Sequence, residues 1–289
     1  MKAEFKEKSF EHAFMGELRL RTNFLFAPDQ CDENLLGFDG AVFLPWQDFP
    51  PFLPFIRRRR HHRRFGMTAS EIGEFGQELN SRLPPFRLNV FIQFKRNHFL
   101  KQKNATEWAS WKRSYFRYPI QEHQQQLMNK IALVAKGRAA ALYAAAAFHE
   151  NDELFKHQVS DAIIDNSNIA SAPLLNGHKC FTYINPGNFG IGHSTPEEIE
   201  SPSFDELINN GADFETSSFT KHMKTTANFL KEVLEDDPER KNTLYLARKA
   251  IVGGAMSEVY PRAEGSWLDA IVTIMAFSLA FNIRTCAIS

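Results

Sequence analysis

The sequence predicts an α/β protein whose C-terminal part is mostly helical. Three observations predict this. Residues Leu88–Lys95 alternate with the period of a strand. The amphipathic stretch Gln121–Lys136 is predicted as a helix that ends at Gly137. The following run, Arg138–Phe148, is open to two interpretations: its alanines favour a helix, but an apolar run after a Gly stop suits a strand, and we predict the strand. Beyond Ser218, the pattern favours three further helices.

The chain opens with a predicted helix over Ser9–Arg21. Phe10, Phe14 and Leu18 recur every four residues, which places them on one helix face. Ser9 is a candidate N-cap, because its hydroxyl can accept from the first free backbone N–H groups.

Strands and a loop are predicted next. Asn23–Ala27 and Leu35–Leu44 are short and apolar, as strands are, while the four prolines of Pro45–Pro54 indicate a loop. A short helix is predicted over Ser70–Ser81. In the strand Leu88–Lys95, one face then carries Leu88, Val90, Ile92 and Phe94, and the other carries Asn89, Phe91, Gln93 and Lys95.

The second half of the chain is predicted to contain one strand and several helices. His178–Gly192 is predicted as a strand that runs into a loop. The three helices of the tail are predicted at Ser218–Glu235, Lys241–Val252 and Ser266–Ile283. Ser266, with an Asp three residues later, gives the last helix a start that resembles a capping box.

Length and composition exclude several classes of protein. The 289 residues suit one large domain, or one domain with a sizeable appendage, and 43% hydrophobic residues exclude a disordered tail, a collagen-like rod and a coiled coil. Three cysteines without a Cys-x-x-Cys pair argue against a disulfide framework and a zinc finger. The start lacks a signal-peptide run, and polar residues interrupt Leu268–Ile283, so we expect no membrane span and a cytoplasmic location.

Charge is unevenly distributed although the net charge is zero. Residues 1–120 hold 20 Lys and Arg against 13 Asp and Glu, whereas residues 150–289 hold 11 against 20. Six arginines in one run supply much of the basic excess: Arg57, Arg58, Arg59, Arg60, Arg63 and Arg64. Such a run can hardly be buried, so it is either a solvated loop or a contact to nucleic-acid phosphates.

Several catalytic motifs are absent from the sequence. There is no Walker-type phosphate loop, no HExxH and no GxSxG. The glycines of PGNFGIGHS have a spacing reversed from the dinucleotide fingerprint and indicate a turn. A small-molecule enzyme that uses His193 or Cys180 has little support, because buried cysteines are usually inert.

One constellation of polar residues suggests chemistry. Gln93 and Lys95 stand two apart in a predicted strand and therefore share a face. Asp39, in the segment GFDGAV, can join them from a neighbouring strand, and Glu11 lies on the first helix. Carboxylate and amide oxygens are ligands that Mg²⁺ prefers, and a bound Mg²⁺ activates water for attack on a phosphodiester. The alternative is that Lys95 is an edge-strand charge that deters aggregation.

The order of these residues resembles the PD-(D/E)XK nuclease superfamily. A helix Glu, then GFDG at a strand start, then FIQFK is most similar to the branch with Gln in place of the second acid, as in Mrr-type restriction enzymes and nucleases of bacterial anti-phage defence systems. The resemblance implies a restriction-endonuclease-like mixed sheet flanked by helices, and Mg²⁺ or Mn²⁺ as cofactor. It also implies the residue roles: Asp39, Gln93 and Glu11 bind the metal, with Glu17 and Glu33 as substitutes for Glu11, and Lys95 assists attack.

The resemblance covers residues 9–148. The 54 positions between Asp39 and Gln93 exceed what a hairpin needs, so we expect a basic insertion near residues 45–85. The predicted organisation is a nuclease-like domain over residues 1–195 and a helical accessory region over residues 196–289. Residues 168–199 resemble an accessory region of defence proteins, with no chemistry assigned.

Two functional hypotheses follow. The first is a metal-dependent DNA endonuclease that acts as the effector of an anti-phage defence system, with the Arg57–Arg64 run on the DNA backbone. The second is a catalytically inactive nuclease-like module that binds nucleic acid or a partner protein. The chain has no ATP motif, so an ATPase or sensor would be a separate subunit. The helix Ser266–Ile283 is apolar almost all round, which favours burial in the core or in a homo-oligomer interface.

Overall fold

The computed structural model describes residues 1–22, 25–27, 69–209, 217–253 and 264–289. The chain forms two compact units. Unit 1 comprises Met1–Asn23 and Val90–Phe214, and unit 2 comprises Phe24–Asn89 and Glu215–Ser289. The division falls inside strand β2 (Leu88–Lys95), so both units draw on an early and a late segment of the chain.

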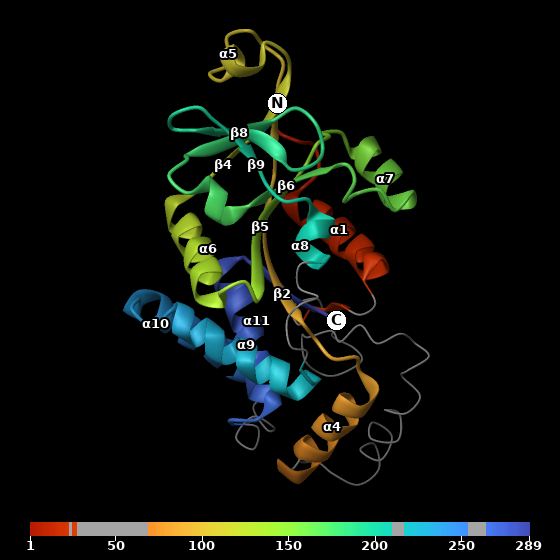
Figure 1. Cartoon of the computed structure of the whole chain (residues 1–289), viewed down its shortest axis with the longest axis vertical. Helices are drawn as coiled ribbons and strands as arrows, with labels where there is room; N and C mark the ends of the chain where they lie inside the picture. Colours follow the sequence, from red (N-terminus) through yellow and green to blue (C-terminus); the bar gives the residue numbers. More distant parts are fainter. Residues whose placement is uncertain (23–24, 28–68, 210–216, 254–263) are drawn as a thin grey trace. The chain divides into compact units, whose positions relative to one another are not determined.

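Unit 1 contains a sheet in which every neighbouring pair is antiparallel, in the order β3-β4-β7-β8-β9 (Figure 1). Its strands are β3 (His98–Leu100), β4 (Tyr115–Pro119), β7 (Cys180–Tyr183), β8 (Phe189–His193) and β9 (Glu197–Glu200). Phe116 lies opposite Tyr183 and Tyr118 opposite Phe181. The rings of the first pair stack, and those of the second pair are in tilted contact, on one face of the sheet. Arg117 and Thr182 pair between them and therefore point to the other face.

The other strands of unit 1 are the end of β2, β5 (Ala139–Ala146) and β6 (Ser167–Ser171), in that order. Strand β5 pairs antiparallel with β6. Helix α6 (Glu122–Ala135) packs against β5 through its buried stripe. It ends because Lys136 takes up a left-handed conformation, a common way for a helix to stop.

Helix α1 (Glu7–Arg21) packs on β2 through aromatic rings. The ring centroids of Phe10 and Phe14 lie 5.8 and 5.2 Å from that of Phe94, with edge-to-face geometry. Helix α7 (Asn151–Val159) lies along α1. The remaining short elements of unit 1 are α5 (Trp108–Trp111), the 3₁₀ turn η2 (Ala172–Leu175) and α8 (Phe204–Asn209).

Unit 2 combines a short antiparallel strand pair with helices. Strand β1 (Leu25–Phe26) pairs with β10 (Arg284–Ile288), and the backbone N–H of Arg87 donates to the carbonyl of Ile288 at 3.0 Å. The helices are α4 (Ala69–Arg82), α9 (Phe219–Val233), α10 (Pro238–Gly253) and α11 (Trp267–Phe281).

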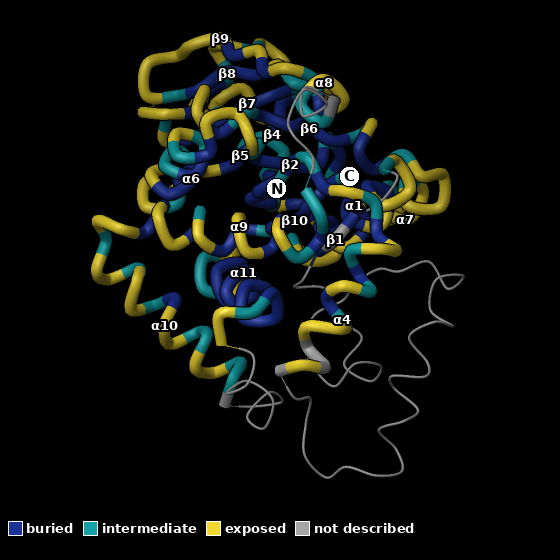
Figure 2. The backbone as a smooth tube through the Cα atoms, turned by 60° about the horizontal axis from the view of Figure 1, so that its bottom comes forward, coloured by how far each residue is buried: buried dark blue, intermediate teal, exposed yellow. Residues whose placement is uncertain are grey.

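The core of unit 2 is built around α11, which is buried from Trp267 to Ser278. Figure 2 shows this helix dark along its length, whereas α10 is exposed over most of its surface. Ser266 caps α11 by accepting from the backbone N–H groups of Leu268 and Asp269. Core burial, the first of the two alternatives for this apolar helix, is therefore confirmed for these residues.

Most elements with a strong sequence pattern are confirmed. Strand β2 has the predicted bounds, and α1, α4, α6, β5, α9, α10 and α11 lie on the predicted segments. The N-cap prediction was wrong: the first helix begins at Glu7, so Ser9 lies inside its first turn and Lys6 is the N-cap. The segment His178–Gly192 forms two paired strands, β7 and β8, where one strand was predicted.

The strands β3, β4, β6, β9 and β10 were missed, because short strands leave too few alternations for a pattern to show. The predicted strand Leu35–Leu44, the loop Pro45–Pro54 and the first part of the insertion near residues 45–85 lie outside the described residues. The boundary at residue 195 stays a prediction.

The fold is thus mixed α/β, with two sheets flanked by helices and a mostly helical C-terminal part. No helix within the described ranges combines the length and the apolar character that crossing a membrane requires.

Candidate functional site

The structure describes three of the four predicted catalytic residues. Gln93 and Lys95 lie in β2, and Glu11 lies in α1. Asp39 lies outside the described residues, as do Glu33 and the arginine run Arg57–Arg64. The described part of the candidate site therefore consists of the last residues of β2 and the side chains that contact them.

Strand alternation places Gln93 and Lys95 on one face of β2 and Phe94 on the other. Helix α1 covers the Phe94 face, through the rings of Phe10 and Phe14. Helix α6 reaches the opposite face, where its side chain Gln124 contacts Lys95. The predicted sharing of a face by Gln93 and Lys95 agrees with this arrangement.

Lys95 is enclosed by two partners. Its Nζ donates a hydrogen bond of 2.7 Å to Oε1 of Gln124 and lies 5.3 Å from the ring centroid of Tyr143 in β5. The residue is only 8% exposed, although Lys is rarely buried without an ion-pair partner. A neutral amide and an aromatic face are weaker compensation for an ammonium than a carboxylate would be.

The surroundings of Lys95 change its acidity. Burial lowers the pKa of Lys95 to about 8, and the negative charge of Glu7 only partly opposes this shift. Near neutral to mildly alkaline pH the amine is therefore able to accept a proton as well as to carry a charge. An amine poised in this way is suited to acid–base or electrostatic work.

The carboxamide of Gln93 has an unused oxygen. Gln93 is 1% exposed, its Nε2 donates at 3.3 Å to the carbonyl of Phe94, and its Oε1 has no hydrogen-bond partner among the described residues. The hydroxyls of Tyr118 and Tyr143 also lack partners there. A buried polar atom without a partner costs about 1–3 kcal/mol, so each of these atoms marks either a cost in stability or a contact to a ligand.

Glu11 lies on helix α1 and forms an ion pair within that helix. Glu11 belongs to α1, which packs on the Phe94 face of β2, and its carboxylate pairs with Lys8 at 2.9 Å. The substitute Glu17 has a structural role: it accepts from the backbone N–H of Ile164 at 3.0 Å and pairs with Arg21. The metal-binding role of Glu11 stays a prediction that the contacts of Gln93 and Lys95 do not support.

Gln93 fits one position of a hard-cation site and does not complete it. Its free Oε1 is the kind of neutral oxygen that Mg²⁺ accepts as a ligand. Across the described ranges, no group of three or more His, Cys, Asp or Glu residues could hold a metal ion. The sequence motifs offer Asp39, which lies outside these ranges, as a carboxylate to join Gln93.

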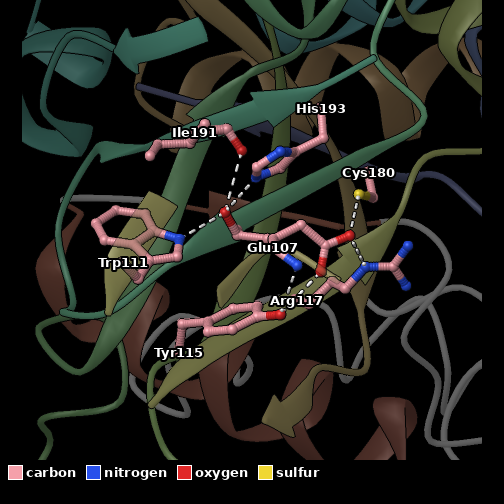
Figure 3. A network of polar contacts seen from close by, with 8 residues as sticks. Glu107, Trp111, Tyr115, Arg117, Cys180, Ile191 and His193 are labelled. Carbon is pink, nitrogen blue, oxygen red and sulfur yellow. Dashed lines mark hydrogen bonds and ion pairs between the residues drawn. The ribbon is translucent and has the colours of Figure 1, made fainter. Parts of the chain in front are cut away.

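A second polar cluster lies on the other sheet of unit 1 (Figure 3). Glu107 is buried. Its carboxylate accepts hydrogen bonds from the Tyr115 hydroxyl at 2.9 Å and from Nε of Arg117 at 3.0 Å. Burial alone would raise the pKa of Glu107, but the hydrogen bond from Tyr115 and the charge of Arg117 outweigh it and lower that pKa. Glu107 is therefore a stably ionised carboxylate.

The same cluster ties Trp111 to the sheet. The indole Nε1–H donates to Oγ1 of Thr182 at 2.8 Å, and this hydroxyl lies 2.8 Å from Nε2 of His193 and 3.3 Å from the carbonyl of Ile191 (Figure 3). Thr182 is fully buried. The cluster thus fixes the segment that carries Glu107 and Trp111 onto strands β4, β7 and β8.

The cluster has little nucleophilic character. Cys180 is 3% exposed, and burial raises the pKa of its thiol, which keeps it protonated. Burial likewise lowers the pKa of His193. The hypothesis of an enzyme that uses Cys180 or His193 gains no support from this geometry.

Sequence reasoning missed the residues that surround Lys95. Gln124 belongs to the correctly predicted helix α6, and Tyr143 to the correctly predicted strand β5. The available signal for Gln124 was its spacing, because it stands three residues before Leu127 of the predicted buried stripe and therefore near the same face of the helix. Nothing in the local sequence of β5 indicates that Tyr143 lies over a lysine.

No protein-family description matches the chain, and no curated protein or solved structure was found that resembles it.

Proposed function

We propose that the chain is a divalent-metal-dependent nuclease that hydrolyses phosphodiester bonds of DNA at the Gln93–Lys95 face of β2. The observation that carries the proposal is the buried pairing of a free amide oxygen with an amine of lowered pKa on one strand face. The restriction-endonuclease-like likeness and the contribution of Asp39 rest on the sequence motifs. The sequence alone also supports three further parts of the proposal: a role as an effector of anti-phage defence, a partner ATPase and a cytoplasmic location.

Each residue has a definite task in this proposal. A bound Mg²⁺ would supply Lewis-acid activation of water and neutralise charge on the phosphate. Gln93 Oε1 and the Asp39 carboxylate would hold the ion. Lys95 Nζ would accept a proton from the attacking water or, when protonated, face the phosphate oxygens. Gln124 would keep the Lys95 amine in place through its 2.7 Å hydrogen bond.

A second function is favoured by one observation. Gln93 and Lys95 are 1% and 8% exposed, so a phosphodiester cannot reach both side chains as the described residues stand. A nuclease-like module that binds nucleic acid or a partner protein without cutting needs no such access. Metal dependence distinguishes the two, because only the nuclease requires an ion for its activity.

Cleavage of supercoiled plasmid tests the proposal. Wild type is assayed with Mg²⁺, with Mn²⁺ and with EDTA, beside Lys95→Ala and Gln93→Leu. The matched controls are Lys156→Ala and Gln126→Leu, whose residues are exposed on α7 and α6. We expect nicking that needs metal and that only the β2 variants abolish.

Two results would count against the nuclease. Nicking that survives EDTA would indicate metal-independent chemistry, and nicking that survives Lys95→Ala would place the site elsewhere. If wild type does not cut, calorimetric titration with Mn²⁺ of wild type and Gln93→Leu decides between the functions. Absence of binding to the wild type would favour the non-cutting module.

A further inference from the structure

The connection between β3 and β4, residues Lys101–Ser114, is strongly basic on its surface. We call this segment the arm. Its four cationic side chains are all exposed: Lys101, Lys103, Lys112 and Arg113. Figure 1 shows the arm, labelled at α5, standing clear of the rest of unit 1.

The one acidic residue of the arm does not offset this charge at the surface. Glu107 is 7% exposed and shares its carboxylate between Tyr115 and Arg117 (Figure 3). Its charge is therefore compensated inside the fold. The outer surface of the arm carries four positive charges and no exposed carboxylate of its own.

Among the described residues, none of the four cationic side chains has a hydrogen-bond or ion-pair partner. The Lys101 ammonium lies 5.0 Å from the ring centroid of Phe99. Basic side chains elsewhere in unit 1, such as Arg21 and Arg117, do have acidic partners. The arm thus offers charges that a polyanion can use.

The base of the arm is fixed in place. Trp111 is anchored to Thr182 by a hydrogen bond of 2.8 Å, and Glu107 is anchored to strand β4. Lys112, in a left-handed conformation, closes the short helix α5 by donating its backbone N–H to the carbonyl of Trp108 at 2.8 Å. Less conformational freedom is lost when an anchored segment binds than when a loose one does.

The surroundings of the arm are also positive. Burial lowers the pKa of His98, at the start of β3, and the charges of Lys2, Arg117 and Arg96 act in the same direction. Trp108, on the arm itself, is half-buried, and an aromatic side chain of this kind is a common stacking partner of nucleic-acid bases.

We propose that the arm binds the sugar-phosphate backbone of nucleic acid, with Lys101, Lys103, Lys112 and Arg113 on the phosphates. This inference rests on the proposed function in one respect: the nucleic acid that the arm binds is taken to be the substrate of the proposed nuclease. Phosphate contacts of this kind carry no base specificity, so the arm would hold nucleic acid without reading its sequence.

The test compares two quadruple variants with equal loss of charge. The arm variant changes Lys101, Lys103, Lys112 and Arg113 to Ala. The control variant changes four exposed lysines of α9 and α10 to Ala, namely Lys221, Lys224, Lys231 and Lys241. Fluorescence anisotropy measures binding to a labelled 20-base-pair duplex and to one of its strands, in EDTA, over a range of NaCl concentrations.

We expect the arm variant to bind at least about tenfold more weakly at 0.1 M salt. Its plot of log affinity against log salt for the duplex should flatten by roughly 3 to 4, since each neutralised phosphate contributes about 0.9 to the slope. The control variant should keep the wild-type slope. A third variant, Trp111→Phe, removes the anchoring N–H but no charge, so it should weaken binding with the salt slope retained.

Three results would overturn the proposal: no binding of either probe by wild type, a wild-type slope in the arm variant, or an equal loss in the control. Because binding is measured in EDTA, its outcome does not depend on catalysis. Plasmid cleavage by wild type with Mg²⁺, run in parallel, reports on the nuclease separately. Arm-dependent binding without cleavage refutes the nuclease alone, and cleavage with arm-independent binding refutes the arm alone.

Discussion

Replacing Lys95 by Met is expected to stabilise the protein while abolishing any activity of the site. Lys95 is 8% exposed, and its amine has a neutral amide and an aromatic ring as its described close contacts. Met has a similar length and no charge, so it fills the same volume without the cost of burying an ammonium. A residue kept for function at the expense of stability behaves in this way.

The magnitude follows from the pKa of Lys95. A shift from 10.5 to about 8 corresponds to about 3 kcal/mol of unfavourable free energy for the charged form. Below pH 8 the amine is protonated in both the folded and the unfolded state, so this whole cost is present. Between pH 8 and 10.5 the unfolded state holds the extra proton, and the stability of the wild type therefore rises with pH.

Lys95→Met should accordingly be more stable than wild type by about 2–3 kcal/mol at pH 7, after the loss of the hydrogen bond to Gln124 is allowed for. The difference should shrink as the pH rises from 8 to 10.5. Urea unfolding followed by circular dichroism, at pH values across this window, measures it. Lys156→Met, on an exposed position of α7, is the control and should differ little from wild type at any pH.

A difference in unfolding free energy that does not change with pH would show that burial of the Lys95 ammonium carries no cost in stability. Lower stability of Lys95→Met than of wild type at pH 7 would show instead that the lysine is stabilising where it lies. Titration of the protein by NMR with ¹³C-labelled lysine, with Lys95→Met to assign the signal, gives the pKa directly.

Three further predictions concern other parts of the chain. Burial lowers the pKa of His222 to about 4, so the unfolding free energy should fall by about 3 kcal/mol from pH 6.5 to 4. Urea unfolding should show this fall in wild type but not in His222→Gln, and an equal fall in the variant would contradict the prediction. A Cβ at Gly190 would lie 2.5 Å from the carbonyl oxygen of Thr182, so Gly190→Ala should cost about 1–3 kcal/mol in thermal unfolding, whereas Gly16→Ala, with open space around it, should not. Glu107→Ala leaves the Tyr115 hydroxyl and Arg117 Nε without their acceptor and should speed amide hydrogen exchange in the arm. Mass spectrometry measures the exchange, with Glu122→Ala at an exposed position as the control, and equal exchange in both variants would argue against the anchoring role.

Local sequence patterns are sufficient to predict the most regular elements of the chain. Strand β2 shows full alternation over eight residues, and α6 and α11 carry apolar stripes or a clear N-cap, so their bounds follow from the chain alone. The alternation also fixed that Gln93 and Lys95 share a face, because side chains two apart in a strand point the same way. That much of the candidate site needs no tertiary information.

The residues that surround Gln93 and Lys95 depend on long-range packing and follow from no local pattern. Gln124 is 29 residues from Lys95, and Glu17 reaches Ile164 over 147 residues, and no local pattern encodes such meetings. The structure also put α1, and Glu11 with it, on the Phe94 face of β2, because the rings of Phe10 and Phe14 pack there. The spacing of apolar residues shows which side chains share a face of a helix or strand, but which element covers that face depends on long-range packing. For that reason the partners of Lys95, and the anchored arm with its four exposed cations, became visible only in the folded chain.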